Sequence, residues 1–184
     1  MENSIVGRRQ FVLALPALAL VPGRANADLY DDYINSTSKQ PFVMFLARKG
    51  VPGHAFVGIG VQLNAGLIVH ERFFGYYPTG GDKFAEAKLV FGKTSGALDY
   101  KWKDTQWDVT YRKDVDETKK QAALAVADKW KSNDPKYNLF SLGGKNCSSF
   151  AAEVAKAVAL NAPAGAGAML PFDYIDKLRK ANGG

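Results

Sequence analysis

The chain is poor in the side chains that most often build disulfides and metal sites. Its 184 residues include one cysteine, Cys147, and two histidines, His54 and His70. A single cysteine excludes a disulfide within the chain. One thiol and two separated imidazoles make a poor ligand set for zinc, so we expect no metal. Gly165-x-Gly167 lacks the preceding strand that a phosphate-binding glycine loop requires, and we expect no cofactor.

The positive charge is not concentrated in one part of the sequence. The formal net charge is +6, and the lysines are scattered rather than gathered in a dense stripe. We therefore expect no nucleic-acid partner, whereas a mildly basic surface suits an anionic cell wall or membrane. With 47% apolar and 23% charged residues, the composition is that of an ordinary globular protein. The length predicts one folded domain.

The first 27 residues are typical of an export signal. Arg8-Arg9 precede an apolar run over residues 11–21 that is short for a membrane span, and Ala25-Asn26-Ala27 forms a small-x-small cleavage site. The arginine pair resembles a twin-arginine signal, which implies export of a folded protein. We predict a signal peptide over residues 1–27, a domain over residues 28–184 and a periplasmic or secreted location. The Sec route and an uncleaved N-terminal anchor remain alternatives.

Two apolar runs and a turn predict a hairpin in the first half of the domain. Residues 42–47 and 54–61 have the composition of buried strands. Turn-forming residues at 63–66 predict a return strand over residues 67–74. An aromatic and glycine-rich segment, residues 75–81, predicts a loop that closes this unit.

The second half of the chain is predicted to be mainly helical. Residues 100–112 alternate polar and apolar side chains, which indicates one or two strands. Residues 116–132 predict a helix with Asp116 as a possible N-cap. Another helix is expected to begin at Cys147, and a short last helix covers residues 173–181.

The cysteine lies at the head of its predicted helix. Asn146 is a good N-cap residue, and Phe150 and Val154 continue the helix face on which Cys147 lies. A thiol in the first turn meets free backbone N–H groups and the positive end of the helix dipole, and both favour the thiolate. A small buried cysteine that only packs the end of a core helix is the alternative.

Two short motifs together resemble the permuted, NlpC-type papain-like superfamily. They are residues 53–58 (Gly-His-Ala-Phe-Val-Gly) and residues 146–150 (Asn-Cys-Ser-Ser-Phe), the latter preceded by Tyr-Asn-Leu at 137–139. That group includes bacterial cell-wall peptidases and amidases, and relatives similar to lecithin retinol acyltransferase. Residues 72–78 resemble a motif of bacterial members. The resemblance covers residues 42–160 and implies an α+β, circularly permuted papain-like fold with an antiparallel sheet packed against the cysteine-bearing helix.

The resemblance also implies roles for single residues. Cys147 is expected to be the nucleophile, with its backbone N–H in an oxyanion hole, and His54 the base that takes the thiol proton. Family members carry an orienting residue on the next strand, and His70 is the first candidate there. A tight hairpin would separate His70 from His54 by about 16 Å, whereas a wider loop would bring them together. Glu71 and Tyr76 are weaker candidates.

The aromatic side chains Tyr76 and Tyr77 are predicted to bind substrate beside His54, with core packing as the alternative. Together these expectations describe an exported cysteine peptidase or amidase that acts on peptidoglycan or another peptide amide through an acyl-enzyme. Lipid acyl transfer or thioester hydrolysis on the same fold is one alternative. A non-catalytic binding module with a structural cysteine is the other.

Overall fold

The computed structural model of the chain describes residues 39–50, 53–63, 66–79, 95–99, 107–133, 136–138 and 144–184. The predicted export signal lies outside these residues. So do residues 100–106, where part of a strand was expected.

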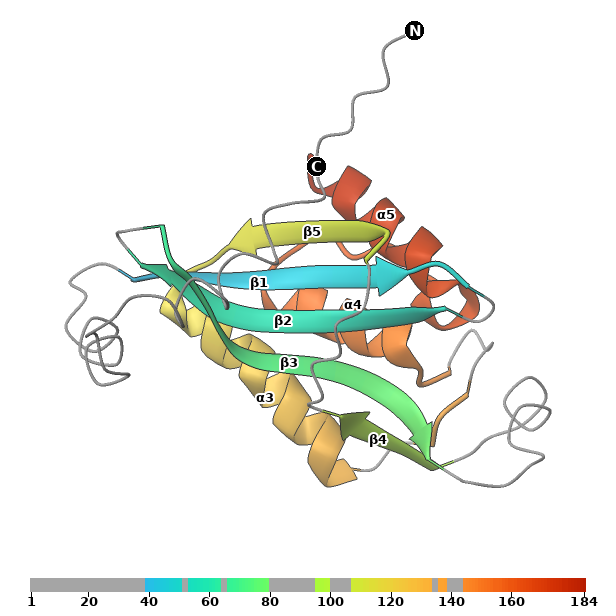
Figure 1. The fold of residues 1–184 in the computed structure, drawn as a ribbon. Coiled ribbons are helices and arrows are strands. Elements are labelled where there is room, and N and C mark those ends of the chain that lie inside the picture. The colour runs from blue at the N-terminus through green and yellow to red at the C-terminus, as the bar shows by residue number, and fades with distance from the viewer. Residues whose placement is uncertain are drawn as a thin grey trace, which may run out of the picture. The chain divides into compact units, whose positions relative to one another are not determined.

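Five antiparallel strands form one sheet in the order β4-β3-β2-β1-β5 (Figure 1). The strands are β1 (Lys39–Arg48), β2 (His54–Leu63), β3 (Ile68–Thr79), β4 (Ser95–Asp99) and β5 (Val109–Asp114). The two apolar runs expected to be buried strands are β1 and β2, and both strands are buried along almost their whole length. They lie near the middle of the sheet, so side chains on both of their faces pack against other parts of the chain.

In the described part of the chain, three α-helices lie on one face of the sheet (Figure 1). They are α3 (Glu117–Asn133), α4 (Cys147–Ala157) and α5 (Pro171–Ala181), and a short 3-10 helix, η2 (Ala166–Ala168), precedes α5. The predicted helices are confirmed to within a few residues at each end, and the domain is α+β with an antiparallel sheet, as expected. Within the described ranges, no helix is both long and apolar enough to cross a membrane.

The sheet buries a separate set of apolar side chains on each face, because successive residues of a strand point to opposite sides. The helix-covered face carries Ala55, Val57 and Ile59 of β2, which pack with Cys147 and Phe150 of α4. The second face carries Phe42, Met44, Leu46, Phe56 and Phe73, with Tyr77 and Trp107 packed against them. The alternation therefore places His54 on the second face and its neighbour Ala55 on the helix-covered face.

The hairpin between β2 and β3 departs from a regular ladder. The register shifts by one residue between Ile59 and Gly60. A Cβ on Gly60 would lie 2.1 Å from the Val69 carbonyl oxygen, so only glycine fits at this bulge. The loop predicted over residues 75–81 is wrong for residues 75–79, because β3 continues to Thr79 by pairing with β4, and residues 80 and 81 lie outside the described part of the chain. The short β4 carries no clear strand pattern, so its pairing was not expected.

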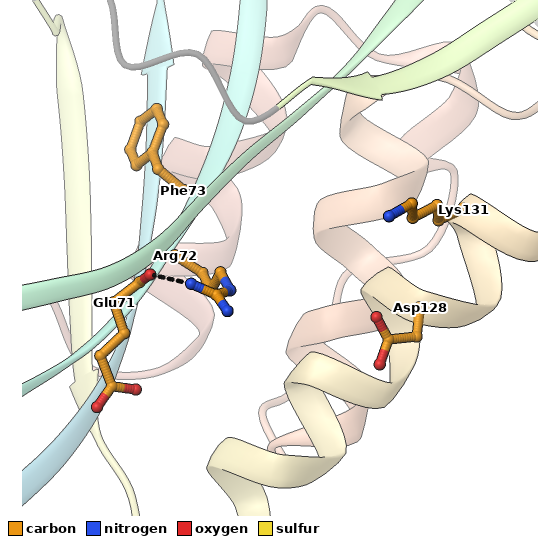
Figure 2. A pocket seen from close by; sticks show the side chains of 5 residues that line it. All are labelled: Glu71, Arg72, Phe73, Asp128 and Lys131. Carbon is orange, nitrogen blue, oxygen red and sulfur yellow. Dashed lines mark hydrogen bonds between the residues drawn. The ribbon is translucent and has the colours of Figure 1, made fainter.

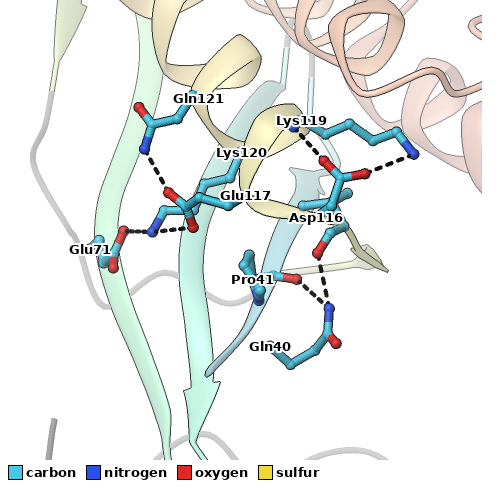
Figure 3. A network of polar contacts seen from close by, with 9 residues as sticks. Gln40, Pro41, Glu71, Asp116, Glu117, Lys119, Lys120 and Gln121 are labelled. Atoms are coloured by element: carbon cyan, nitrogen blue, oxygen red, sulfur yellow. Dashed lines mark hydrogen bonds and ion pairs between the residues drawn. The ribbon is translucent and has the colours of Figure 1, made fainter. Parts of the chain in front are cut away.

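Polar contacts tie the start of α3 to the sheet (Figure 3). Asp116 accepts a backbone hydrogen bond of 2.8 Å in the first turn, which confirms it as the N-cap. The Lys120 ammonium lies 2.7 Å from the Glu71 carboxylate of β3. Gln40 at the start of β1 donates a 3.0 Å hydrogen bond to the Val115 carbonyl oxygen. Glu71 thus pairs with α3, which removes it as a candidate to orient His54.

Candidate active site

Cys147 is the first residue of α4, as predicted, and its N-cap is held from two sides. Asn146 accepts a 3.0 Å hydrogen bond from the Ser149 N–H and donates one of 2.9 Å to the Gly167 carbonyl oxygen beside η2. The cap residue is itself buried, and Cys147 is 1% exposed. The thiol is therefore fixed at the helix start but sealed from solvent in this conformation.

Burial governs the protonation of the thiol. It raises the pKa of Cys147, while the N–H groups of Ala55 and Ser148 and the hydroxyl of Tyr137 lower this pKa by less through hydrogen bonds. The expected thiolate is therefore not favoured here, because desolvation outweighs the donors at the helix start. A protonated thiol needs a base before it can attack a carbonyl carbon.

Tyr137 was not expected to have a role, although it lies in one of the motifs that carry the resemblance. Residues 137 and 145 form an isolated parallel bridge, and the Asn138 N–H donates to the Lys145 carbonyl oxygen at 2.9 Å. The ring stacks on Tyr76, with centroids 5.6 Å apart. Burial raises the pKa of Tyr137, as does its hydrogen bond to the thiol, so its hydroxyl stays a neutral donor.

Tyr76 lies in the helix-covered core rather than on the face that carries His54. Its side chain is fully buried, and its ring also packs edge-on against Trp130 at 4.7 Å. The strand alternation explains the difference between the two predicted tyrosines. Because β3 continues past Gly75, Tyr76 points into the helix-covered core and Tyr77 points to the second face.

His54 is the first residue of β2, and its ring lies on the second face of the sheet. It stacks on Tyr77, with centroids 4.1 Å apart and an interplanar angle of 24°, and meets Phe56 edge-on at 4.4 Å. Its Nε2 atom is buried and makes no hydrogen bond. Burial, helped by the charge of Arg48, lowers the pKa of His54 to about 3. The imidazole is therefore neutral at pH 7, and its burial in this position opposes protonation.

The fold brings the two predicted catalytic residues to the same end of β2. The Ala55 N–H, which interacts with the Cys147 thiol, belongs to the peptide that joins His54 to Ala55. Cys147 therefore lies beside the backbone of His54. The side chains are not joined, since the imidazole Nε2 has no hydrogen-bond partner.

His70 is not positioned to orient His54, and its assignment as a catalytic residue is corrected. His70 pairs with Gly60, which places it about 20 Å along β2 from His54 at about 3.3 Å per residue. It packs edge-on against Phe42, with ring centroids 5.5 Å apart. Burial and the Arg112 charge lower the pKa of His70. The hairpin turn is tight, so the wider loop that would have joined the two histidines does not form.

A separate cavity of about 540 Å³ lies between β3 and α3 (Figure 2). Its lining residues are Glu71, Arg72, Phe73, Asp128 and Lys131. The lining carries charges of both signs and includes neither Cys147 nor His54. Three or more side chains of the metal-binding types do not gather anywhere in the described part of the chain.

Comparisons with known proteins assign no family to this chain. No family model, no curated protein and no solved structure matches it. Its function must therefore be argued from the motifs and the geometry described above.

Proposed function

We propose that the domain is a cysteine hydrolase with a circularly permuted papain-like fold. The observation that carries the proposal is the contact between the Cys147 thiol and the Ala55 N–H, because it sets a helix-start nucleophile against the first peptide of the strand that begins with His54. An antiparallel sheet with α4 packed on it is compatible with this fold. The neutral imidazole with an unused Nε2 supplies the base that a protonated thiol requires.

In the proposed reaction the S–H proton passes to His54 Nε2, and Cys147 Sγ forms a bond to the carbonyl carbon of an amide. The Cys147 backbone N–H stabilises the resulting oxyanion. The imidazolium returns its proton to the amide nitrogen as the C–N bond breaks, which leaves a thioester and a free amine. His54 then deprotonates a water molecule that cleaves the thioester, giving a carboxylic acid and restoring the thiol.

Peptide amides of peptidoglycan are the proposed substrate, and the periplasm or the extracellular space is the proposed location. The signal-like sequence of residues 1–27 and the net charge of +6 support both, because they suit an exported protein beside an anionic wall. The amide chemistry itself comes from the resemblance to cell-wall peptidases and amidases.

Hydrolysis of purified peptidoglycan fragments tests the proposal. Cys147→Ala should abolish turnover and leave the thermal unfolding transition in place. His54→Ala should lower kcat by about 10²–10⁴-fold, the usual contribution of a general base. His70→Gln is the matched control, because it changes the same residue type about 20 Å away on the same sheet face. Full turnover by Cys147→Ala would refute the hydrolase.

A binding module with a structural cysteine is the second candidate. Two observations favour it: Cys147 is 1% exposed, and His54 Nε2 makes no hydrogen bond to it. On this hypothesis the folded protein should resist alkylation by iodoacetamide at pH 7 and hydrolyse no wall fragment. His54→Ala should then leave the reactivity of the thiol unchanged.

A further inference from the structure

The Tyr77 ring fixes the His54 imidazole in a position from which it does not reach the thiol. The two rings are nearly parallel, with centroids 4.1 Å apart, and Phe56 closes the edge of the imidazole at 4.4 Å. Phe56 and Tyr77 also contact each other, with centroids 6.0 Å apart. The three rings form one aromatic cluster on the face of the sheet that α4 does not cover.

Gly75 provides the space for this arrangement. It pairs with Phe56 across the β2–β3 ladder, so a side chain at this position would point to the second face. An added Cβ would lie 2.7 Å from Tyr77 Cε2 and 2.9 Å from His54 Nε2. These distances are shorter than carbon atoms tolerate, so the imidazole can occupy this place only because residue 75 is glycine.

We propose that Tyr77 is a positioning residue that holds the His54 imidazole over Gly75, and that His54 reaches the Cys147 thiol when this stack opens. This proposal rests on the proposed hydrolase, in which His54 is the base, and it assigns to Tyr77 the control of that base. Because the side chain of His54 starts on the face opposite α4, the ring reaches the thiol only if the backbone of this first residue of β2 turns when the stack opens, and the contact of the thiol with the Ala55 N–H places Cys147 at the same strand end.

Burial, together with the charge beside His54, keeps the stacked ring neutral. Arg48 of β1 pairs with His54 across the ladder, and its positive charge opposes protonation of the imidazole. Tyr77 of β3, the Cys147 thiol of α4 with the Tyr137 hydroxyl bonded to it, and Lys49 and Asp108 beyond Arg48 are further titratable groups at this strand end. An aromatic stack of this kind shifts an equilibrium by about two- to tenfold. A substrate therefore needs only a comparable preference for the open position to release the base.

The rate of Cys147 alkylation by iodoacetamide at pH 7 reports the fraction of molecules in which the His54 ring has left Tyr77 and reached the thiol, because thiol activation depends on His54. Tyr77→Ala should raise this rate by about two- to tenfold through loss of the stack. Gly75→Ala should raise it as well, since the new methyl group displaces the ring. Tyr77→Phe keeps the stacked ring and should react at the wild-type rate.

Two controls separate positioning from a general loosening of the fold. In a His54→Gln background, Tyr77→Ala should produce no acceleration. The NMR signals of the His54 ring should titrate at a higher pH in Tyr77→Ala than in the wild type, because the released ring meets solvent.

The outcomes distinguish the two proposals. If His54→Gln reacts like the wild type at every pH, the hydrolase proposal fails. If the rate depends on His54 but Tyr77→Ala and Gly75→Ala change neither the rate nor the titration, the positioning role is overturned and the hydrolase stands. If Tyr77→Ala accelerates alkylation equally without His54, Tyr77 only shields the thiol, and the positioning role is again overturned.

Discussion

The two faces of the sheet surround their reactive groups with different chemistry. On the helix-covered side, hydrogen-bond donors from β2, α4 and Tyr137 surround the Cys147 thiol. On the second face, two aromatic rings enclose the His54 imidazole, and its Nε2 has no hydrogen-bond partner. The Cys147 thiol therefore has hydrogen-bond donors around it, whereas the His54 imidazole has an apolar environment.

Burial favours the neutral form of both groups. It raises the pKa of Cys147 and lowers the pKa of His54, so each group favours its neutral form. The resting pair is therefore a thiol and an imidazole, not a thiolate and an imidazolium. In the proposed reaction, the thiolate and the imidazolium would form only when the two groups meet.

Removal of a core ring on the helix-covered face should have the largest effect. Phe150 is fully buried against Phe74 and Trp130. Phe150→Ala should lower the free energy of unfolding by about 3–5 kcal/mol, measured by urea denaturation. Phe172→Ala, which truncates a partly buried ring of α5, is the matched control and should cost clearly less. Equal losses would show that α4 does not anchor this face.

Acid should lower the free energy of unfolding chiefly through the second face, where His54 lies. Between the pKa of an unfolded histidine, near 6.5, and the folded value of about 3, the unfolded chain binds a proton that the folded His54 does not. The contribution of neutral His54 to the free energy of unfolding is therefore fully present above pH 6.5. Below pH 6.5, the free energy of unfolding decreases by up to about 1.4 kcal/mol for each unit by which the pH is lowered.

Urea denaturation from pH 7 to pH 4 checks this expectation. His54→Phe should flatten the pH dependence relative to the wild type, because the proton-binding group is gone, while the carboxylates contribute equally to both proteins. Parallel curves for the two proteins would mean that His54 is protonated in the folded state.

Removal of the two helix caps should lower the free energy of unfolding by different amounts. Asn146→Ala removes the hydrogen bonds that a buried cap makes with Ser149 and Gly167, and it should lower the free energy of unfolding by about 2 kcal/mol. Asp116→Ala removes the exposed cap of α3 and should cost less. Thermal denaturation of both variants measures the difference. A larger loss for Asp116→Ala would contradict the importance of the buried cap.

The ion pair beside the cysteine helix should have the smallest effect. Glu153 pairs with Lys145 and accepts a 2.8 Å hydrogen bond from Trp130 Nε1, and both charged side chains are partly exposed. Glu153→Gln keeps an acceptor for Trp130 and should cost less than about 1 kcal/mol. This cost should shrink further at high salt, in denaturation curves recorded at low and at high ionic strength. An undiminished cost in salt would point to the Trp130 hydrogen bond instead.

Local patterns predicted the secondary structure around the site well. The cap at Asn146 and the helix start at Cys147 depend on neighbouring residues, so they could be predicted from the sequence. The face on which His54 lies could not. Both faces of β2 carry apolar residues, so alternation alone does not say which of them packs against α4.

The position of His70 required long-range information. Its distance from His54 depends on the register of the hairpin, which the turn and the bulge at Gly60 set together. Likewise, the separation of Tyr76 from Tyr77 follows from pairing with β4, whose sequence, Ser-Gly-Ala-Leu-Asp, gives no strand signal. Such pairings depend on residues far apart in the chain.

The position of β1 between β2 and β5 leaves one edge of β1 unpaired until β5 has been synthesised. The second neighbour, β5, pairs with β1 as far as Asp114, and Gln40 donates a hydrogen bond to the Val115 carbonyl oxygen at the same end of β1. On the ribosome, β1 can form a hairpin with β2 long before β5 emerges. During that interval its apolar edge is open to pairing with other nascent chains. We therefore expect the interval before residue 114 emerges to be the one in which the chain most needs a chaperone.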